Sequence, residues 1–209
     1  MKASDGTTGV IGLGTGRCAT TSLAEFLSMQ RGVISSHWAM EYVRWQPTGR
    51  DVRKALAWWE KRMEEAAQAG AAFRADVSPW HLPYVERYLE AFDSVAVVAL
   101  YREREATAKS WARALSSYRF LQKSDTSARR CFPTFAVDDA YTAALRYWDL
   151  YQAHVDRLIE RYPNAVRRFD LEALNARQGQ ESILDWVGVG IEDPAARRYP
   201  KDCTFHTVV

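Results

Sequence analysis

The segment with the clearest chemical pattern lies near the amino end, where a short apolar run passes into glycines, an arginine and three hydroxyl residues. The run at 9–13 has the composition of a buried strand, and Leu23, Phe26 and Leu27 recur behind it at helical spacing. A strand that turns into a helix points backbone N–H groups and the positive end of the helix dipole at one spot. The pattern therefore predicts an anion-binding site.

The residues of this turn are the candidates for holding the anion. Glycines let the backbone bend so that its N–H groups face inward, an arginine supplies a full positive charge, and hydroxyl groups donate hydrogen bonds. The candidates are Gly14, Gly16, Arg17, Cys18, Ala19, Thr20, Thr21 and Ser22.

Three familiar phosphate-binding patterns fit this turn less well. The Walker A pattern needs glycine and lysine where Ala19 and Thr20 stand, which disfavours an ordinary ATP or GTP site. A dinucleotide fold tolerates Ala19 but needs an acidic residue about 20 positions on, near His37. A phosphatase built on Cys18 needs arginine where Ala24 stands. A glycine-rich turn without a ligand is the remaining alternative, although the clustered arginine and hydroxyls exceed what a turn requires.

The run GTGRCATTSLAEFL resembles the 5′-phosphosulfate loop of the sulfotransferases that use 3′-phosphoadenosine 5′-phosphosulfate (PAPS). In that family the loop reads [RK]-[SC]-G-T-T and leads into a helix. Arg17 takes the basic position, Cys18 the small position, and Thr20 with Thr21 the hydroxyl pair. Ala19 stands where the family has glycine.

A second stretch, VVALYREREATAKSW, resembles the family's 3′-phosphate motif, an arginine at a strand end with a serine eight residues later. Arg102 and Ser110 match that spacing, and the resemblance implies that both bind the 3′-phosphate of the nucleotide. Arg102 follows the β-branched run 94–101 at its carboxyl end, the edge where parallel sheets place ligands. The plain alternatives are an ion pair of Arg102 with Glu103 or Glu105 and a solvent-facing Ser110.

Two further resemblances are shorter. AARRYP is similar to a G-R-K-Y-P loop that closes over the nucleotide, which implies that Arg197 and Arg198 lie near the 3′-phosphate. ADVSPWHLPY resembles the segment that carries a catalytic glutamate in the heparan-type branch, and Asp76 takes the place of that glutamate.

The resemblance implies sulfuryl transfer from PAPS to a hydroxyl or amine, with adenosine 3′,5′-bisphosphate as the product and no metal ion required. Arg17 would then stabilise charge on the leaving phosphate. The base for the acceptor is left open among Asp76, His37 and His81, in that order of preference. Asp76 would need its pKa raised by burial to work near neutral pH. Its alternatives are a helix cap or an ion pair with Arg74.

The order of patterns predicts an α/β fold: three layers with a central, mainly parallel sheet of about four to five strands flanked by helices, similar to the P-loop NTPases. We expect a single domain over residues 1–209. Asp51 is the expected N-cap of the second helix and Gly70 its stop, and 122–133 is a polar, basic loop that could serve as a lid. Strands are expected at 9–13, 33–36, 72–77, 94–101 and 166–169, and helices at 21–30, 51–69, 79–92, 105–120, 138–161 and 181–187.

The composition limits the classes of molecule that the protein is expected to bind. The 209 residues carry 28 Lys and Arg against 26 Asp and Glu, a formal charge of +2, which argues against nucleic acid as a partner. Three cysteines at irregular spacing favour neither a disulfide framework nor a zinc site, and no apolar run reaches the roughly 20 residues of a membrane span. We expect a cytoplasmic protein whose partners are the nucleotide and an acceptor small molecule or glycan.

The acceptor and the oligomeric state are not predicted. Aromatic residues gather between Trp38 and Trp80, where acceptors dock in such enzymes, but Trp58 and Trp59 fit helix packing better. Two other functions stay open: a small-molecule kinase with a degenerate P-loop, and a nucleotide-binding module without catalysis.

Overall fold

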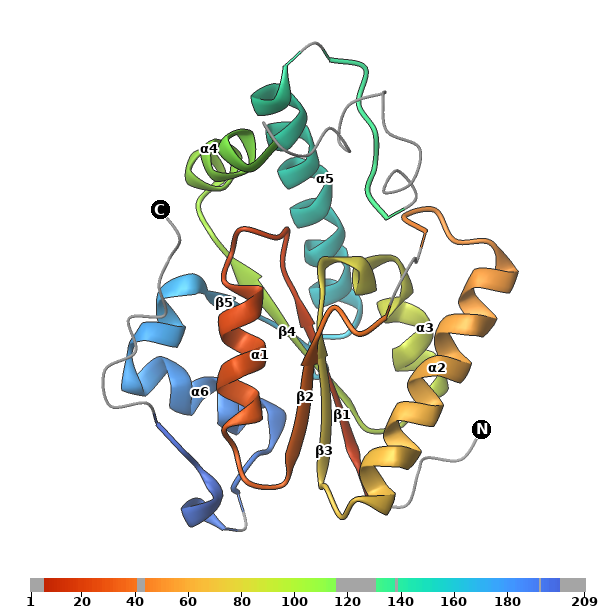
Figure 1. The fold of residues 1–209 in the computed structure, drawn as a ribbon, viewed down its shortest axis with the longest axis vertical. Coiled ribbons are helices and arrows are strands. Elements are labelled where there is room, and N and C mark those ends of the chain that lie inside the picture. The colour runs from red at the N-terminus through yellow and green to blue at the C-terminus, as the bar shows by residue number, and fades with distance from the viewer. Residues whose placement is uncertain (1–5, 41–43, 116–130, 138, 192, 200–209) are drawn as a thin grey trace.

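The computed structural model of the chain describes residues 6–40, 44–115, 131–137, 139–191 and 193–199 (Figure 1). Its centre is a five-stranded sheet in the order β2-β3-β1-β4-β5, and every neighbouring pair of strands is parallel. The expected α/β fold class, with a parallel sheet between helical layers, is confirmed. The strands are β1 (Thr8–Leu13), β2 (Val33–His37), β3 (Phe73–Val77), β4 (Val95–Tyr101) and β5 (Val166–Asp170).

Helices cover both faces of the sheet (Figure 1). One apolar core joins the sheet to α1 and α6, and the other joins it to α2, α3, α4 and α5. The α-helices are α1 (Thr20–Ser28), α2 (Gly49–Gln68), α3 (Val85–Ala91), α4 (Arg104–Leu115), α5 (Ala140–Arg161) and α6 (Arg177–Val187). The 3₁₀ helices are η1 (Pro79–Tyr84), η3 (Leu171–Asn175) and η4 (Pro194–Ala196).

The interior strand β4 shows why the sheet has two buried faces. Its apolar sequence has no polar side to turn toward water, and the side chains of Val97 and Val98 are both fully buried. Val97 belongs to the core with α2 and α5, whereas Val98 belongs to the core with α1 and α6.

Several expected helix boundaries differ from the structure, and α6 begins at Arg177 rather than at 181. The N-cap of α2 is Thr48 rather than Asp51: the Thr48 hydroxyl accepts the Asp51 amide at 3.3 Å, and the Asp51 carboxylate accepts the Thr48 amide at 2.9 Å. The helix expected at 79–92 is η1 followed by α3. In an α-helix the Pro83 ring would clash with the Pro79 carbonyl, which disfavours an α-helical start here.

The expected loop at 122–133 lies only partly within the described residues, because its residues 122–130 fall outside them. Cys131 and Phe132 are buried, and the Phe132 ring packs edge-on against Trp111 and Tyr147. In the part of the chain that the structure describes, no helix is long and apolar enough to cross a bilayer.

Strands β1 and β4 lie side by side at the centre of the sheet, with Leu13 paired with Ala99. The chain leaves β1 toward β2 on one side and leaves β4 toward β5 on the other. Such a reversal opens a crevice at the carboxyl ends of the two strands, where open α/β sheets bind ligands. The turn at 14–19 directly follows β1 and Arg102 directly follows β4, so both lie at this edge of the sheet.

The turn after β1 has an unusual backbone. Gly16, Arg17 and Ala19 have φ of +76°, +58° and +59°, the left-handed region. Glycine adopts that region without penalty, but a residue with a Cβ atom pays about 1–2 kcal/mol. Ala19 therefore stores strain at the position where the family pattern has glycine.

Replacing Ala19 by glycine is expected to raise the free energy of unfolding by about 0.5–1 kcal/mol, because the Cβ clash disappears. Ala57 is the matched control: it is exposed within α2, where glycine should lower the free energy of unfolding by about 1 kcal/mol. Urea unfolding of both variants measures the difference. A similar loss of stability in both variants would contradict the left-handed conformation of Ala19.

Candidate functional site

The glycines of the turn are required by close packing. A Cβ atom on Gly14 would collide with Cys18 Sγ, and one on Gly16 would lie 2.7 Å from the Trp111 ring. Cys18 is buried, and burial raises the pKa of its thiol to about 11. Cys18 is thus a packing residue of the turn, because a buried neutral thiol is a poor nucleophile.

The amino end of α1 lies at the carboxyl edge of the sheet and offers free donors. Its N-cap, Ala19, has no side chain that can accept a hydrogen bond, and the first helical bond runs from the Leu23 amide to the Ala19 carbonyl. The amides of Thr20, Thr21 and Ser22 therefore have no acceptor within the helix. The first turn also holds no acidic residue. This end of α1 can receive an anion.

The second motif lies against this turn. One N–H of the Arg102 guanidinium donates to the Arg17 carbonyl at 2.7 Å, and Arg17 Nε donates to the Ser110 hydroxyl at 3.1 Å. Ser110 is buried, so its hydroxyl faces the arginine rather than solvent. The structure thus brings Arg17, Arg102 and Ser110 together from the segment after β1, the end of β4 and α4.

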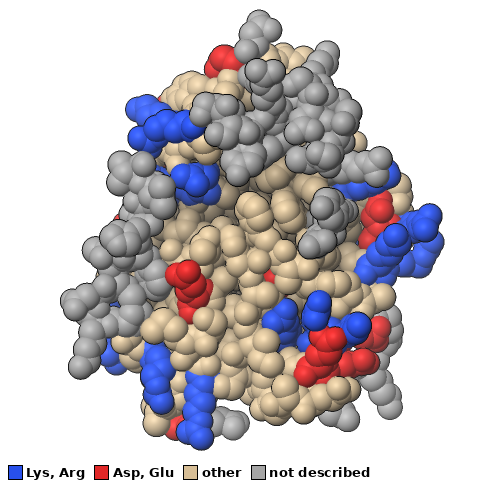
Figure 2. Space-filling view, viewed as in Figure 1, with Lys and Arg blue, Asp and Glu red and all other residues tan. Residues whose placement is uncertain are grey.

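Charge is distributed unevenly over the face of the molecule seen in Figure 2. In Figure 2 the centre of the described surface is mostly uncharged, and charged side chains gather mainly toward its margins. With a net charge of only +2, the chain has no broad positive field to attract an anion. Attraction must come locally from the two guanidinium groups and the helix dipole.

His37 is the predicted base that the structure places at the turn. It ends β2, and its Nε2 lies 3.2 Å from the Thr20 hydroxyl at the start of α1. Burial lowers the pKa of His37, and the negative charge of Asp76 offsets this effect only in part. A neutral imidazole near pH 7 can accept a proton.

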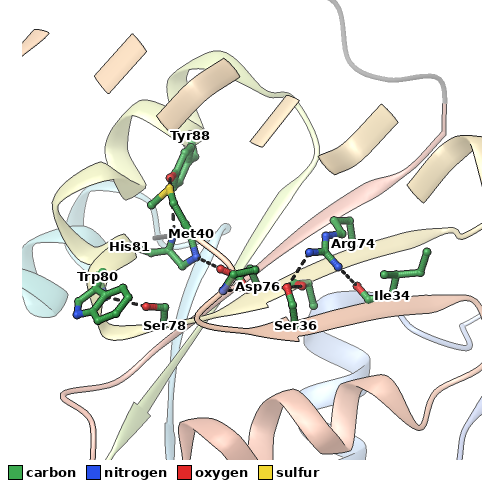
Figure 3. A network of polar contacts seen from close by, with 11 residues as sticks. Ile34, Ser36, Met40, Arg74, Asp76, Ser78, Trp80, His81 and Tyr88 are labelled. Carbon is green, nitrogen blue, oxygen red and sulfur yellow. Dashed lines mark hydrogen bonds and ion pairs between the residues drawn. The ribbon is translucent and has the colours of Figure 1, made fainter. Parts of the chain in front are cut away.

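Asp76 does not match its expected environment. Its carboxylate is fully buried and accepts hydrogen bonds from the Ser36 hydroxyl at 2.6 Å and the Ala39 amide at 3.3 Å, while its other oxygen lies 2.7 Å from His81 Nε2 (Figure 3). Burial alone would raise the pKa of Asp76, but the bonds from His81, Ser36 and Ala39 lower it. The raised pKa expected of a base is therefore absent.

His81, the third base candidate, is fully buried with Asp76. Its Nδ1 lies 3.5 Å from the Tyr88 hydroxyl, and the rings of Trp58 and Trp59 flank it. The imidazole therefore has protein on every side described and no open face toward an acceptor.

Arg197 and Arg198 are not brought to the turn. The Arg197 guanidinium donates to Asp185 at 2.5 Å, and the Arg198 amide donates to the Gln30 side chain at 2.8 Å. Gln30 follows the carboxyl end of α1, and nine residues of helix put that end about 13 Å from the amino end. Contacts at the far end of α1 hold this segment, and its expected approach to the 3′-phosphate stays a prediction.

The sequence reasoning missed two residues that brace the turn. The Tyr151 hydroxyl of α5 accepts the Gly14 amide at 3.0 Å, and the Trp111 indole of α4 donates to the Thr15 carbonyl at 3.2 Å. Trp111 directly follows Ser110, so its position in the sequence could have suggested that it lies near the turn. Tyr151 lies 137 residues from Gly14, and no pattern in the sequence connects the two.

An exposed aromatic surface adjoins His37. Trp38 is 44% exposed, and its ring lies 5.1 Å from His37 and 5.0 Å from Trp80. Trp59, by contrast, is fully buried, as its helical spacing predicts. Among the described residues, no group of three or more His, Cys, Asp and Glu side chains is placed to hold a metal ion.

Comparison with known proteins shows which solved structures share this fold. No protein-family model and no curated protein matches the chain. The sulfotransferase domain from the Synechococcus PCC 7002 olefin synthase is 15% identical, with a TM-score of 0.57 over 90% of this chain and 75% of that one. A sulfotransferase from Alicyclobacillus acidocaldarius is 15% identical, with a TM-score of 0.54 over 87% and 81%.

A third structure, the sulfotransferase domain from the curacin biosynthetic pathway, is 14% identical, with a TM-score of 0.58 over 90% of this chain and 75% of that one. At such identities the likeness concerns the arrangement of strands and helices rather than the chemistry. The chain has the fold of the sulfotransferase domains.

Proposed function

We propose that the protein is a sulfotransferase that moves a sulfuryl group from PAPS to a hydroxyl or amine of an acceptor. One observation carries the proposal: Arg17 contacts both Arg102 and Ser110, so the two segments that resemble the 5′-phosphosulfate and 3′-phosphate motifs lie in contact. They meet on a fold shared with sulfotransferase domains.

The two motifs would grip opposite ends of the nucleotide. Arg17 and the free amides at the start of α1 would hold the 5′-phosphosulfate, because both place positive charge where the phosphate oxygens lie. Arg102 uses one N–H for the Arg17 carbonyl and has four left, enough for a bidentate contact with the 3′-phosphate. Ser110 would add a neutral hydrogen bond.

PAPS supplies an activated sulfuryl group, and the protein aligns it and stabilises charge. In the transfer, a bond forms between the acceptor oxygen or nitrogen and sulfur, and the bond between sulfur and the bridging phosphate oxygen breaks. The acceptor proton goes to His37 Nε2. Arg17 and the α1 dipole stabilise the negative charge that appears on the phosphate. Trp38 offers an apolar surface for the acceptor beside His37.

Nucleotide binding gives a direct test of Arg102. Replacing Arg102 by alanine should weaken binding of adenosine 3′,5′-bisphosphate about ten- to a hundredfold, because a charge-assisted contact worth about 1.5–3 kcal/mol is lost. Affinity for adenosine 5′-monophosphate, which lacks the 3′-phosphate, should change much less. Isothermal titration calorimetry measures both affinities.

Lys109 provides the matched control for this experiment. It precedes Ser110 on α4 and carries the same charge as Arg102, but its side chain is exposed. Lys109→Ala should leave the affinity nearly unchanged. Equal affinity of the unaltered protein for nucleotides with and without the 3′-phosphate would overturn the assignment of Arg102.

Turnover separates the proposed activity from the two alternatives. The protein is incubated with PAPS and a panel of hydroxyl and amine acceptors, and release of adenosine 3′,5′-bisphosphate is measured. Release that depends on an acceptor supports the proposal. Binding without release would indicate a nucleotide-binding module, and magnesium-dependent ATP turnover would indicate a kinase.

A further prediction concerns the base. The pKa of His37 should lie below 6.5, because burial disfavours the imidazolium form more than Asp76 stabilises it. Transfer should then slow as the pH falls through that pKa and stay constant above it, since only the neutral ring accepts a proton. Histidine NMR, assigned with His37→Gln, measures the pKa. A value of 6.5 or higher would contradict the expected environment.

A further inference from the structure

We name residues 36–40 the β2 turn; the segment includes the last two residues of β2. Its backbone is strained at one residue. Trp38 lies in this turn with φ of +58°, a left-handed conformation that is unfavourable for a bulky side chain. His37, directly before it, points to Thr20. Such a conformation persists only where neighbouring contacts impose it.

The contacts that impose it come from β3. The Asp76 carboxylate accepts from the Ser36 hydroxyl before His37 and from the Ala39 amide after Trp38. The Trp38 amide donates to the Val77 carbonyl at 3.2 Å. One carboxylate oxygen, Oδ1, therefore fastens both ends of the two-residue stretch that carries His37.

The carboxylate itself is locked in place. His81 Nε2 holds its second oxygen at 2.7 Å, and Arg74 donates to the Ser36 hydroxyl at 2.6 Å and to the Ile34 carbonyl at 3.3 Å (Figure 3). Asp76 and His81 are both fully buried. A side chain held from two elements in this way cannot swing toward an acceptor without leaving partners unpaired in the core.

We propose that Asp76 is a positioning residue: it holds the β2 turn in its strained form so that His37 Nε2 lies at the amino end of α1, and it takes no proton from the acceptor. The proposal rests on the proposed function only for the role of His37. Its structural part, the fastening of the β2 turn, concerns the protein without any ligand.

Hydrogen exchange and histidine NMR of the ligand-free protein test the structural part. In Asp76→Ala the Ala39 amide loses its acceptor and should exchange about tenfold faster or more. The His37 ring signal should shift toward that of an exposed histidine. Asp76→Asn should restore both signals, because its amide oxygen accepts from Ser36 and Ala39 and its NH₂ can donate to His81.

Two serine variants keep the test decisive if Asp76→Ala does not fold. Ser36→Ala removes the hydroxyl that joins Arg74 to Asp76 and should shift the His37 signal and speed exchange at Ala39. Ser35→Ala is the matched control: Ser35 precedes Ser36 on β2, and its buried hydroxyl has no hydrogen-bond partner among the described residues. It should change neither readout.

The catalytic part is tested with an acceptor that turns over. Asp76→Asn should keep most of kcat, whereas loss of a true base lowers kcat by about 10²–10⁴-fold. Unchanged exchange at Ala39 in a folded Asp76→Ala protein would overturn the proposal, as would loss of kcat in Asp76→Asn with an unshifted His37 signal. If the protein never uses PAPS, the exchange and NMR results still decide whether Asp76 fastens the turn.

Discussion

The parallel pairing of β1 with β4 is the constraint on which the candidate site depends. The pairing of Leu13 with Ala99 ends both strands at the same edge of the sheet, so the glycine turn and Arg102 start beside each other. The two strands are also the pair from which the chain departs in opposite directions. A shift of register by one residue would turn every side chain of the shifted strand to the opposite face and separate Arg102 from Arg17.

Positive charge at the site is concentrated rather than spread. The start of α1 has no side-chain cap and no acidic residue in its first turn, and two arginines join it from different segments. An ordinary helix would satisfy these amides with a serine or aspartate at the N-cap. Here Ala19 stands at that position in a strained conformation, which leaves the amides for a partner from outside the chain.

The sequence was sufficient where local patterns determine structure. Apolar runs and helical spacing predicted the five strands and the main helices, and the end of the β-branched run predicted that Arg102 lies at the carboxyl edge of the sheet. The pairing of Arg102 with Ser110 came from the family resemblance. Long-range contacts were beyond such patterns. The pKa of Asp76 is lowered by His81, five residues away, but also by Ser36 and Ala39, which lie 40 and 37 residues away. The position of Arg198 depends on Gln30, 168 residues away. Short motif matches carry no information on such partners.

The bracing of the turn by Tyr151 and Trp111 has a consequence for binding. The Gly14 amide and the Thr15 carbonyl are already bonded to Tyr151 of α5 and Trp111 of α4, so the core shapes the turn in the absence of any ligand. A ligand that enters a preshaped cradle loses little free energy to ordering it. The shape of the turn thus depends on two side chains, Trp111 of α4 and Tyr151 of α5, and a change at either one would loosen the turn without altering Arg17 or Arg102.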